Sequence, residues 1–463
     1  MQFGDEVGFQ LDINLRTLAL AFQPVSSAQA RWLTRERVIV LFWVAAITTV
    51  IVMANVGPAG WDARISWTAI QSVRQGADPY ASGIAEQQTF RQLPASRRAE
   101  RLPLPGARRF FDYPPLTLTL LRLLSGLPDG LLALLYWSAV AGGFLLQLGA
   151  GFQLADEAER RWLALLLPAV AFFPGLITDD AILSGNVSYI LYGLVLAAAV
   201  PGWKRSQWFW YYIAVVAASI VKPPSLTLLA LPVLLDKRQW LRSASTAIAA
   251  LFLFAASAQM WPELFREHLR ALQTLFDVGA DFGYGPVGVI GRALWDRGWP
   301  YSPATTILYV TFAAALGLVL LFMAYHVRHK NLSRDAWIPV ALVGTFLLNP
   351  RIMKYDMAVI TIPMLLIASR GLRALLQSQT ENLSESSNSN RLLFVGAACF
   401  LIPNLLTVFG PTWWPVELII LLTTFALGAW ALLRTVPEIH PEEIPSFVPD
   451  PIGEPAFEIS AVN

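Results

Sequence analysis

The residues best suited to chemistry follow the first long apolar run of the chain. That run, 38–56, is long enough to cross a membrane, and Trp61-Asp62 comes a few residues after it. A carboxylate at this distance from a span lies at the level of the lipid head groups. Asp62 could act there as general base toward a lipid-linked substrate, a role that contributes about 10²–10⁴-fold in rate. The alternative is an N-cap for a helix over 63–75, where Asp is also favoured, and both roles can coexist.

Two short motifs further along the same loop suit a sugar site. They are Asp78-Pro79-Tyr80 and Asp112-Tyr113-Pro114-Pro115. Aromatic faces stack on sugar rings, and carboxylates accept hydrogen bonds from sugar hydroxyls. The alternative is purely structural, because Asp-Pro and Pro-Pro form turns and a tyrosine is common at a membrane interface.

Cations from distant parts of the chain form a third candidate group. Lys222, Arg351 and Lys354 fall at the expected outer ends of separate spans, and Arg292 belongs to a large second outer loop. One such cation is usually an interface anchor. Several at one membrane level indicate an anion site, and a lipid phosphate is the natural anion there.

A metal centre is not expected. The acidic pair Asp179-Asp180 lacks a third carboxylate nearby in the sequence, so a solvated turn is the better interpretation. The four histidines are scattered, with no His/Cys spacing typical of metal ligands. The single cysteine, Cys399, lies in an apolar run and suits a small core residue.

Composition places these residues in a membrane protein. Hydrophobic residues make up 55% of the chain and charged residues 14%, whereas soluble domains carry about 25% charged residues. We predict an all-α polytopic membrane protein. The net charge of +2 gives no reason to expect a nucleic-acid partner. The N-terminus holds Asp5, Glu6 and Asp12 and no compact apolar segment, so the first span is expected to be a retained anchor.

About twelve transmembrane helices are expected from apolar runs near the ~20 residues that a crossing needs. They cover 38–56, 130–151, 162–178, 186–201, 207–221, 225–236, 243–260, 304–326, 336–350, 356–369, 392–409 and 416–433. Lys and Arg fall on every second short connection, which predicts that both termini lie in the cytoplasm. The expected parts are a cytoplasmic segment 1–36, a transmembrane catalytic domain 37–434 and a disordered tail 435–463.

Two long outer loops, 57–129 and 261–303, follow from this topology. The apolar stretch 116–127 is too short to span and suits an interfacial helix. The stretch 262–276 has helical periodicity with charges on one face, as surface helices do. Lys222-Pro223-Pro224 predicts a broken helix whose irregular centre is shielded inside the protein. The linker 377–390, rich in Ser, Asn and Glu, is expected to be flexible and cytoplasmic.

Taken in order, several motifs resemble those of a known enzyme family. The first outer loop resembles that of bacterial polyprenyl-phosphate-mannose-dependent mannosyltransferases, glycosyltransferase family 87 of the GT-C fold class. The resemblance covers roughly 35–370 and rests on Trp61-Asp62, Gly76-Ala77-Asp78-Pro79-Tyr80, Phe111-Asp112-Tyr113-Pro114-Pro115-Leu116, Leu183-Ser184-Gly185-Asn186, Ile220-Val221-Lys222-Pro223, Tyr284-Gly285-Pro286-Val287-Gly288 and Asn349-Pro350-Arg351 with Lys354-Tyr355. The chain departs from the family pattern at Gly185-Asn186, where Gly-Gln is usual, and at Lys354-Tyr355, where His-Tyr is frequent.

The resemblance implies an inverting transfer of a sugar, mannose in most members, from a polyprenyl-phosphate donor to a lipid-linked or cell-envelope glycan. Asp62 is then the general base. Lys222, Arg351, Lys354 and Arg292 bind the donor phosphate, and no metal or other cofactor is needed. The sugar and acceptor contacts fall on Arg64, Tyr80, Asp112, Tyr113, Asn186 and Tyr355.

Two other functional classes share a polytopic architecture. A transporter or flippase of lipid-linked sugars would also have many spans, but such proteins often contain internal repeats with paired broken helices. Here Pro-Pro recurs at 114–115 and 223–224 without a second half around it. A non-catalytic assembly subunit would leave Asp62 without a role. The large, asymmetric first outer loop favours the enzyme.

Overall fold

The computed structural model describes residues 60–92, 111–157, 159–160, 163, 184–277, 283–297, 303–377 and 416–435, and every regular element in them is helical. Three of the twelve expected spans, 38–56, 392–409 and all of 162–178 except residue 163, lie outside the described residues, as does the Asp179-Asp180 turn. So do Cys399, the linker after Gln377, the tail after 435 and the stretch 93–110.

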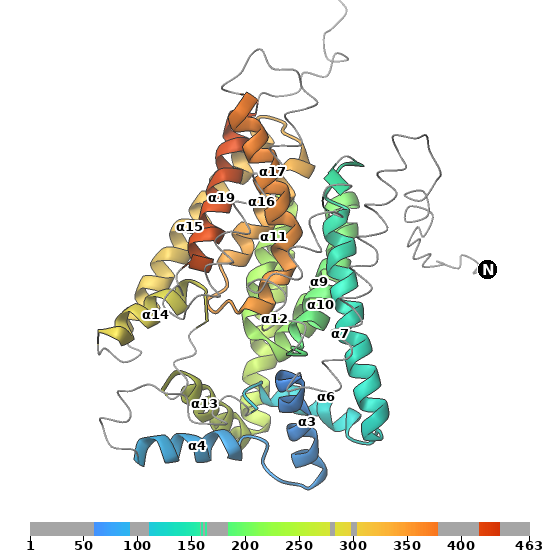
Figure 1. The fold of residues 1–463 in the computed structure, drawn as a ribbon, viewed down its shortest axis with the longest axis vertical. Helices are drawn as coiled ribbons and strands as arrows, with labels where there is room; N and C mark the ends of the chain where they lie inside the picture. Colours follow the sequence, from blue (N-terminus) through green and yellow to red (C-terminus); the bar gives the residue numbers. More distant parts are fainter. Residues whose placement is uncertain are drawn as a thin grey trace, which may run out of the picture.

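The helices form a bundle and a layer across one end of it (Figure 1). The layer contains α3 (Trp61–Arg74), α4 (Ala81–Gln92), α6 (Pro115–Leu124) and α13 (Pro262–Asp277). The bundle contains α7 (Asp129–Phe152), α9 (Ser188–Arg205), α10 (Phe209–Val221), η2 (Pro223–Leu229), α11 (Ala230–Leu235), η3 (Lys237–Gln239), α12 (Trp240–Met260), α15 (Pro303–His329), α16 (Arg334–Leu347), η4 (Lys354–Ile360), α17 (Thr361–Gln377) and α19 (Val416–Arg434). The short helix α14 (Pro286–Asp296) lies beside α15.

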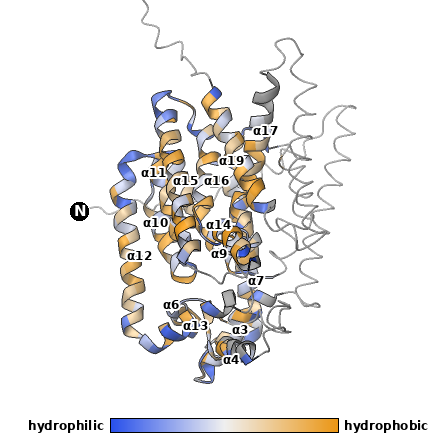
Figure 2. Ribbon diagram, turned by 90° about the vertical axis from the view of Figure 1, so that its left-hand side faces the viewer, coloured by the Kyte–Doolittle hydropathy of each residue, from blue (hydrophilic) through white to orange (hydrophobic). Residues whose placement is uncertain are grey.

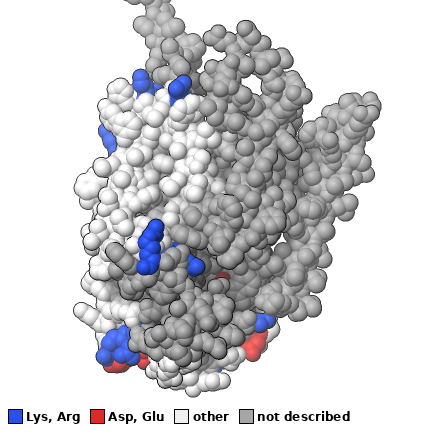
Figure 3. Space-filling view, turned by 60° about the vertical axis from the view of Figure 1, so that its left-hand side comes forward, with Lys and Arg blue, Asp and Glu red and all other residues white. Residues whose placement is uncertain are grey.

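Within the described part of the chain, four bundle helices are long and apolar enough to cross a membrane. They cover Asp129–Phe152, Lys237–Met260, Pro303–His329 and Glu417–Arg434. Figure 2 shows the apolar colouring along the bundle and the more polar layer at its end. Figure 3 shows Lys and Arg near both ends of one face and also about midway between them. The arrangement is that of a multi-pass membrane protein, as the composition predicted.

Helix α12 has its apolar side turned outward, which is typical of a helix in lipid. Its buried residues Ser243, Ala250 and Ser257 are small and recur every seventh position. Its large residues, such as Ile248 and Phe252, are exposed at 66% and 71%. Small residues let helices approach in a membrane, where lipid solvates the large apolar ones as well as a protein core would.

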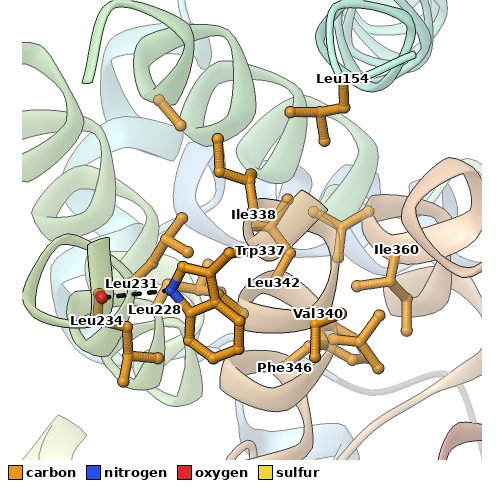
Figure 4. Packing of buried hydrophobic residues seen from close by; sticks show 14 of the residues in the cluster. Leu154, Leu228, Leu231, Leu234, Trp337, Ile338, Val340, Leu342, Phe346 and Ile360 are labelled. Atoms are coloured by element: carbon orange, nitrogen blue, oxygen red, sulfur yellow. Dashed lines mark hydrogen bonds between the residues drawn. The ribbon is translucent and has the colours of Figure 1, made fainter. Parts of the chain in front are cut away.

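The core of the bundle surrounds α16. Trp337 is almost fully buried, and its indole N–H donates to the carbonyl of Leu234 on α11 (3.4 Å; Figure 4). Leu228 and Leu231 pack beside it, together with Phe346 from the next turns of α16. Burying the indole with a hydrogen-bond partner avoids the cost of an unsatisfied donor.

Helices α7 and α9 cross with their backbones in contact. A Cβ on Gly143 would overlap the backbone of Tyr189, and one on Gly193 would overlap the backbone of Gly143. The Gln147 amide donates to the Tyr189 carbonyl at 2.9 Å. Glycine permits this approach because it presents no side chain at the crossing.

The predicted break at Lys222-Pro223-Pro224 is present. Helix α10 ends at Val221, Lys222 leaves helical geometry (φ −125°, ψ 88°), and η2 begins at Pro223. Proline cannot donate the backbone hydrogen bond that would continue the helix. The break leaves Lys222 in the bundle at the end facing α6, whose Thr117 donates to the Ile220 carbonyl at 3.2 Å.

Candidate active site

Asp62 lies in the first turn of α3 and is anchored through its backbone. Gly60 adopts the left-handed conformation (φ 77°) that turns the chain into the helix. The amides of Asp62 and Ala63 both donate to the Ser184 carbonyl, at 3.0 and 3.2 Å. The predicted N-cap role of Asp62 is wrong: Gly60 takes that position, and the Asp62 side chain makes no capping bond. Its carboxylate still benefits from the positive end of the helix dipole.

The Asp62 carboxyl has a raised proton affinity. It is half-buried, and its Oδ2 accepts from the Asn186 amide at 2.9 Å. Burial raises the pKa of Asp62 to about 6, and the negative charge of Asp112 acts in the same direction. The hydrogen bond from Asn186 and the charge of Lys222 oppose the rise. A carboxylate with this pKa is ionised at neutral pH and more basic than an ordinary one, as a general base requires.

A tryptophan on α7 holds the two turns that carry Asp62 and Asn186. The Trp137 ring lies against Gly60 and Gly185, where added Cβ atoms would come within 3.1 and 2.8 Å of it. Gly185 is also left-handed (φ 65°). The neighbouring Tyr136 hydroxyl donates to the Gly185 carbonyl at 2.6 Å. Trp137 therefore packs against both turns and, together with the hydrogen bonds to Ser184 and Asn186, keeps Asp62 and Asn186 close together.

A buried ion pair lies behind this turn. The Lys222 ammonium is 2.9 Å from Asp356 Oδ1, and both side chains are largely inaccessible, at 15% and 4% exposed. Ser188 bridges them: its hydroxyl donates to the same Asp356 oxygen at 2.7 Å and accepts from Lys222. The second oxygen, Oδ2, accepts from the Met353 amide at 3.0 Å.

Tyr355 joins the ion pair to the surroundings of Asp62. The Lys222 ammonium lies 4.4 Å from the centre of the Tyr355 ring, a cation–π contact. The Tyr355 hydroxyl interacts electrostatically with Asp62, Tyr113 and Arg351. These residues come from four separate segments, so the site is assembled by the tertiary fold.

A backbone contact positions Arg351 and α14. The Tyr284 amide donates to the Ile352 carbonyl at 2.6 Å, and the Val287 amide to the Pro350 carbonyl at 3.2 Å. The start of α14, which carries Arg292, is thereby fixed against the segment that carries Arg351. The structure does not describe the side chain of Lys354, which begins η4.

Some of the remaining predicted residues lie near Asp62, and others support those residues from below. Asp112 and Tyr113 interact electrostatically with Asp62 and belong to the site. Tyr80 lies beneath it: its ring is fully buried, and its hydroxyl donates to the Tyr113 carbonyl at 2.8 Å. Asp78 accepts from the Tyr80 amide at 2.9 Å, which is the turn geometry expected of Asp-Pro. Arg64 is exposed on α3.

Sequence reasoning missed three residues that hold the site: Asp356, Trp137 and His268. The sequence did contain a signal for Asp356, because an acid at the start of a predicted membrane span needs a charged or hydrogen-bonding partner. His268 of α13 is 5% exposed and packs on Tyr80 at 5.9 Å between ring centres. Burial lowers the pKa of His268 to about 4, against a hydrogen bond with the Asp112 backbone. Trp137 gave no signal, because its contacts depend on the two glycine turns.

Within the described ranges, no group of three His, Cys, Asp or Glu side chains is arranged to hold a metal ion. The groups available for chemistry there are the Asp62 carboxylate, the amide of Asn186, the tyrosine hydroxyls and the cations. This set suits proton transfer from a hydroxyl next to an anionic leaving group.

Comparison with known proteins identifies the family. Searches of curated proteins and of solved structures gave no match. The family model for glycosyltransferase family 87 matches residues 110–350, more than half of the 463 residues. The match includes Asp112, Asn186 and Lys222, while Asp62 precedes it and Asp356 follows it. The match favours the enzyme over the transporter, and the chain belongs to glycosyltransferase family 87, a family of polyprenyl-phosphate-mannose-dependent enzymes of the GT-C class.

Proposed function

We propose that the protein transfers a hexose, mannose in the first instance, from a polyprenyl-phosphate donor to a hydroxyl of a lipid-linked or envelope glycan. The reaction takes place at the outer face of a bacterial plasma membrane and inverts the anomeric centre. The observation that carries this proposal is Asp62: a half-buried carboxylate with a pKa of about 6, fixed by Ser184 and Asn186.

Asp62 acts on the acceptor. Its carboxylate takes the proton of the acceptor hydroxyl while the hydroxyl oxygen attacks the anomeric carbon. The bond between that carbon and the phosphate oxygen breaks, and its electron pair leaves with polyprenyl phosphate. A single displacement of this kind inverts the anomeric centre and needs one base.

The leaving group needs positive charge, because a phosphate monoester departs as an anion. We assign Arg351, Arg292 and Lys354 to the donor phosphate, where they stabilise the charge that develops on the departing oxygen. Lys222 is the fourth predicted cation. Its ammonium already binds Asp356 and Ser188, and a different role for it is argued below.

The sugar is held by aromatic and polar side chains around the base. Tyr113, Tyr355, Asp112 and Asn186 surround Asp62, and we assign the sugar hydroxyls to them. Tyr80 supports Tyr113 from below, and exposed Arg64 is assigned to the acceptor side.

The role of Asp62 is tested by Asp62→Asn in purified protein with radiolabelled polyprenyl-phosphate mannose and a bacterial glycolipid extract. We expect turnover to fall about 10²–10⁴-fold while donor binding stays within about twofold, because asparagine keeps the shape and removes the base. Asp129→Asn, an exposed carboxylate at the start of α7, is the matched control. Turnover of Asp62→Asn near the parent rate would move the base to Asp112.

The outer location of the site is supported by the cations at the other end of the bundle. Arg160, Arg328 and Arg370 donate there to carbonyls of Phe152, Val233 and Leu154. Positive residues collect on the cytoplasmic side. In a Cys399→Ala background, an impermeant thiol reagent on intact cells should label Gln75→Cys and spare Lys330→Cys. The reverse pattern would place the site inside.

A further inference from the structure

The buried carboxylate of Asp356 is the most heavily bonded acid in the site, and the mechanism above does not use it. Its two oxygens accept from three donors on three segments: Lys222 after α10, Ser188 at the start of α9, and the Met353 amide. The residue is 3% exposed. Asp356 is therefore closed to substrate, and any role in the reaction must act through its partners.

One partner is Lys222, whose position depends on this ion pair. Lysine is long and flexible, and a broken helix end alone gives its ammonium no fixed place. The Asp356 oxygen and the Ser188 hydroxyl fix it over the Tyr355 ring. In that position its charge acts on Asp62, while Asp356 neutralises much of it.

The other partner leads to Asp62 through the turn 184–188. Ser188, held by Asp356, donates its amide to the Asn186 side-chain oxygen at 2.8 Å. The same Asn186 side chain donates its nitrogen to Asp62 at 2.9 Å. A continuous hydrogen-bonded path therefore runs from Asp356 through Ser188 and Asn186 to Asp62.

We propose that Asp356 is a positioning residue for the reaction: it holds Lys222 beside Asp62 with its charge partly neutralised, and it fixes the turn that presents Asn186 to Asp62. The proposal rests on the assignment of Asp62 as the base. Lys222 then adjusts the basicity of Asp62, and the donor phosphate is left to the other cations. If Lys222 were unpaired, its full charge would make Asp62 a weaker base.

The groups that face Asp62 come from every element packed around it. They are Ser184 and Asn186 of the turn, Lys222 after α10, Asp112 and Tyr113 before α6, Tyr136 on α7, and Tyr355 on η4. Among the groups that act on Asp62, Lys222 is the cation. Asparagine at 356 keeps an oxygen that can accept from the Ser188 hydroxyl, so the turn that carries Asn186 is retained. Lys222 is then the group through which loss of the Asp356 charge changes the titration of Asp62.

The test is a direct titration of Asp62 that needs no turnover. Infrared difference spectra of the full chain in lipid nanodiscs follow the Asp62 carboxyl band, which is identified by its loss in Asp62→Asn. The proteins compared are the parent, Asp356→Asn, Lys222→Met and the double variant. Glu159→Gln, which changes an acid at the far end of the bundle, is the control and should leave the midpoint unchanged.

A parent midpoint near pH 6 is expected. Asp356→Asn should lower it by about 0.5–1 pH unit, because the charge of Lys222 is no longer neutralised. Lys222→Met should raise it by a similar amount. The double variant should match Lys222→Met, since Asp356 acts through Lys222 and an unpaired buried acid takes up a proton in any case.

The proposal is overturned if Asp356→Asn shifts the Asp62 midpoint equally in the parent and in the Lys222→Met background. It is also overturned if Asp356→Asn shifts the midpoint in neither. If Asp356→Asn alone does not fold, the comparison of Lys222→Met with the double variant decides. Equal Asp62 midpoints in these two proteins, both above the parent midpoint, support the proposal, and unequal midpoints refute it. Failure of the proposed function is seen separately, as normal turnover in Asp62→Asn.

Discussion

Two carboxylates at opposite ends of the bundle have opposite surroundings. Glu159, after α7, is 3% exposed and receives two bonds of 2.8 Å from the Arg370 guanidinium. It also exchanges hydrogen bonds with Asp156, its amide donating to Asp156 and its own carboxylate accepting from the Asp156 amide. Asp62 is half-buried, and the described side chains that hydrogen-bond to it, Asn186 and Ser184, are neutral.

The difference separates an acid that builds the fold from an acid that can react. The bidentate partner of Glu159 also donates to the carbonyls of Leu154 and Asp335, so the whole group joins α7, α16 and α17. At Asp62, the nearby cation Lys222 is already paired with Asp356. Burial without a paired charge is what raises the pKa of Asp62.

The largest effect on stability is expected at the Glu159 end. Arg370→Met leaves a buried carboxylate without its partner and should lower the free energy of unfolding by about 3–5 kcal/mol. Adding Glu159→Gln should restore much of that loss. Arg266→Met, which removes an exposed pair with Glu263, is the control and should cost less than about 1 kcal/mol. Thermal unfolding in detergent measures the parent and these three variants. Equal losses of stability in Arg370→Met and Arg266→Met would show that the buried pair at the Glu159 end contributes no more than an exposed one.

At the Asp62 end, we expect the cations to bind the donor phosphate rather than to stabilise the fold. Arg351→Gln should weaken donor use about 10–150-fold, equivalent to the ~1.5–3 kcal/mol of a charge-assisted hydrogen bond, with little change in stability. Arg297→Gln, an exposed arginine just past α14, should leave both unchanged. Donor affinity is read by binding of labelled polyprenyl-phosphate mannose. Loss of stability without loss of affinity would make Arg351 a structural cation like Arg370.

The rigidity of the Asp62 turn can be tested with two glycines of similar conformation. Gly185 and Gly76 have φ of 65° and 67°, but a Cβ meets Trp137 at 2.8 Å in the first and nothing within 4 Å in the second. Gly76→Ala should cost about 1 kcal/mol from backbone strain alone. Gly185→Ala should cost about 1–3 kcal/mol more and reduce turnover, because Asn186 moves with the turn. Equal costs for the two would mean that Trp137 yields easily and does not fix Asp62.

The smallest effect concerns the free energy of unfolding that the buried, ionised Asp62 costs the protein. The pKa of Asp62 lies above its ordinary value of 3.8, so the folded state holds the proton more tightly and the ionised acid opposes folding above pH 6. Asp62→Asn should therefore stabilise the protein by about 1–2 kcal/mol at pH 7.5, and the gain should vanish as the pH falls from 6 to below 4. Glu159→Gln should destabilise at pH 7.5. A loss of stability in Asp62→Asn would show that its carboxylate is structural too.

Local signals in the sequence predicted several elements of the described part of the bundle. The run predicted over 130–151 is α7, Asp129–Phe152, because its hydropathy sets its length. The stretch 262–276 is α13, and the break at Lys222 follows from the two prolines after it. The Asp62 site was only partly predictable. Asp356 lies 134 residues from Lys222 and 168 from Ser188, and no local pattern links residues so far apart.

The N-cap prediction failed for a local reason. Asp62 is favoured at an N-cap by its side chain, whereas Gly60 takes the position by its left-handed backbone, two residues earlier. The competing signal was present in the sequence as Gly60 before Trp61-Asp62. The helix consequently begins at Trp61, and the carboxylate is left available for Asn186.

The crossing of α7 and α9 has a consequence for how related sequences should vary. A side chain at 143 or 193 would force apart the two helices that carry Trp137 and the turn before Ser188. Among homologues, these two glycines should therefore change as rarely as Asp62 itself, although neither can touch a substrate. Positions such as Ile248 on the exposed face of α12 should drift freely among apolar residues. Low variability in this family should therefore mark the residues that support the proposed base as strongly as the proposed base itself.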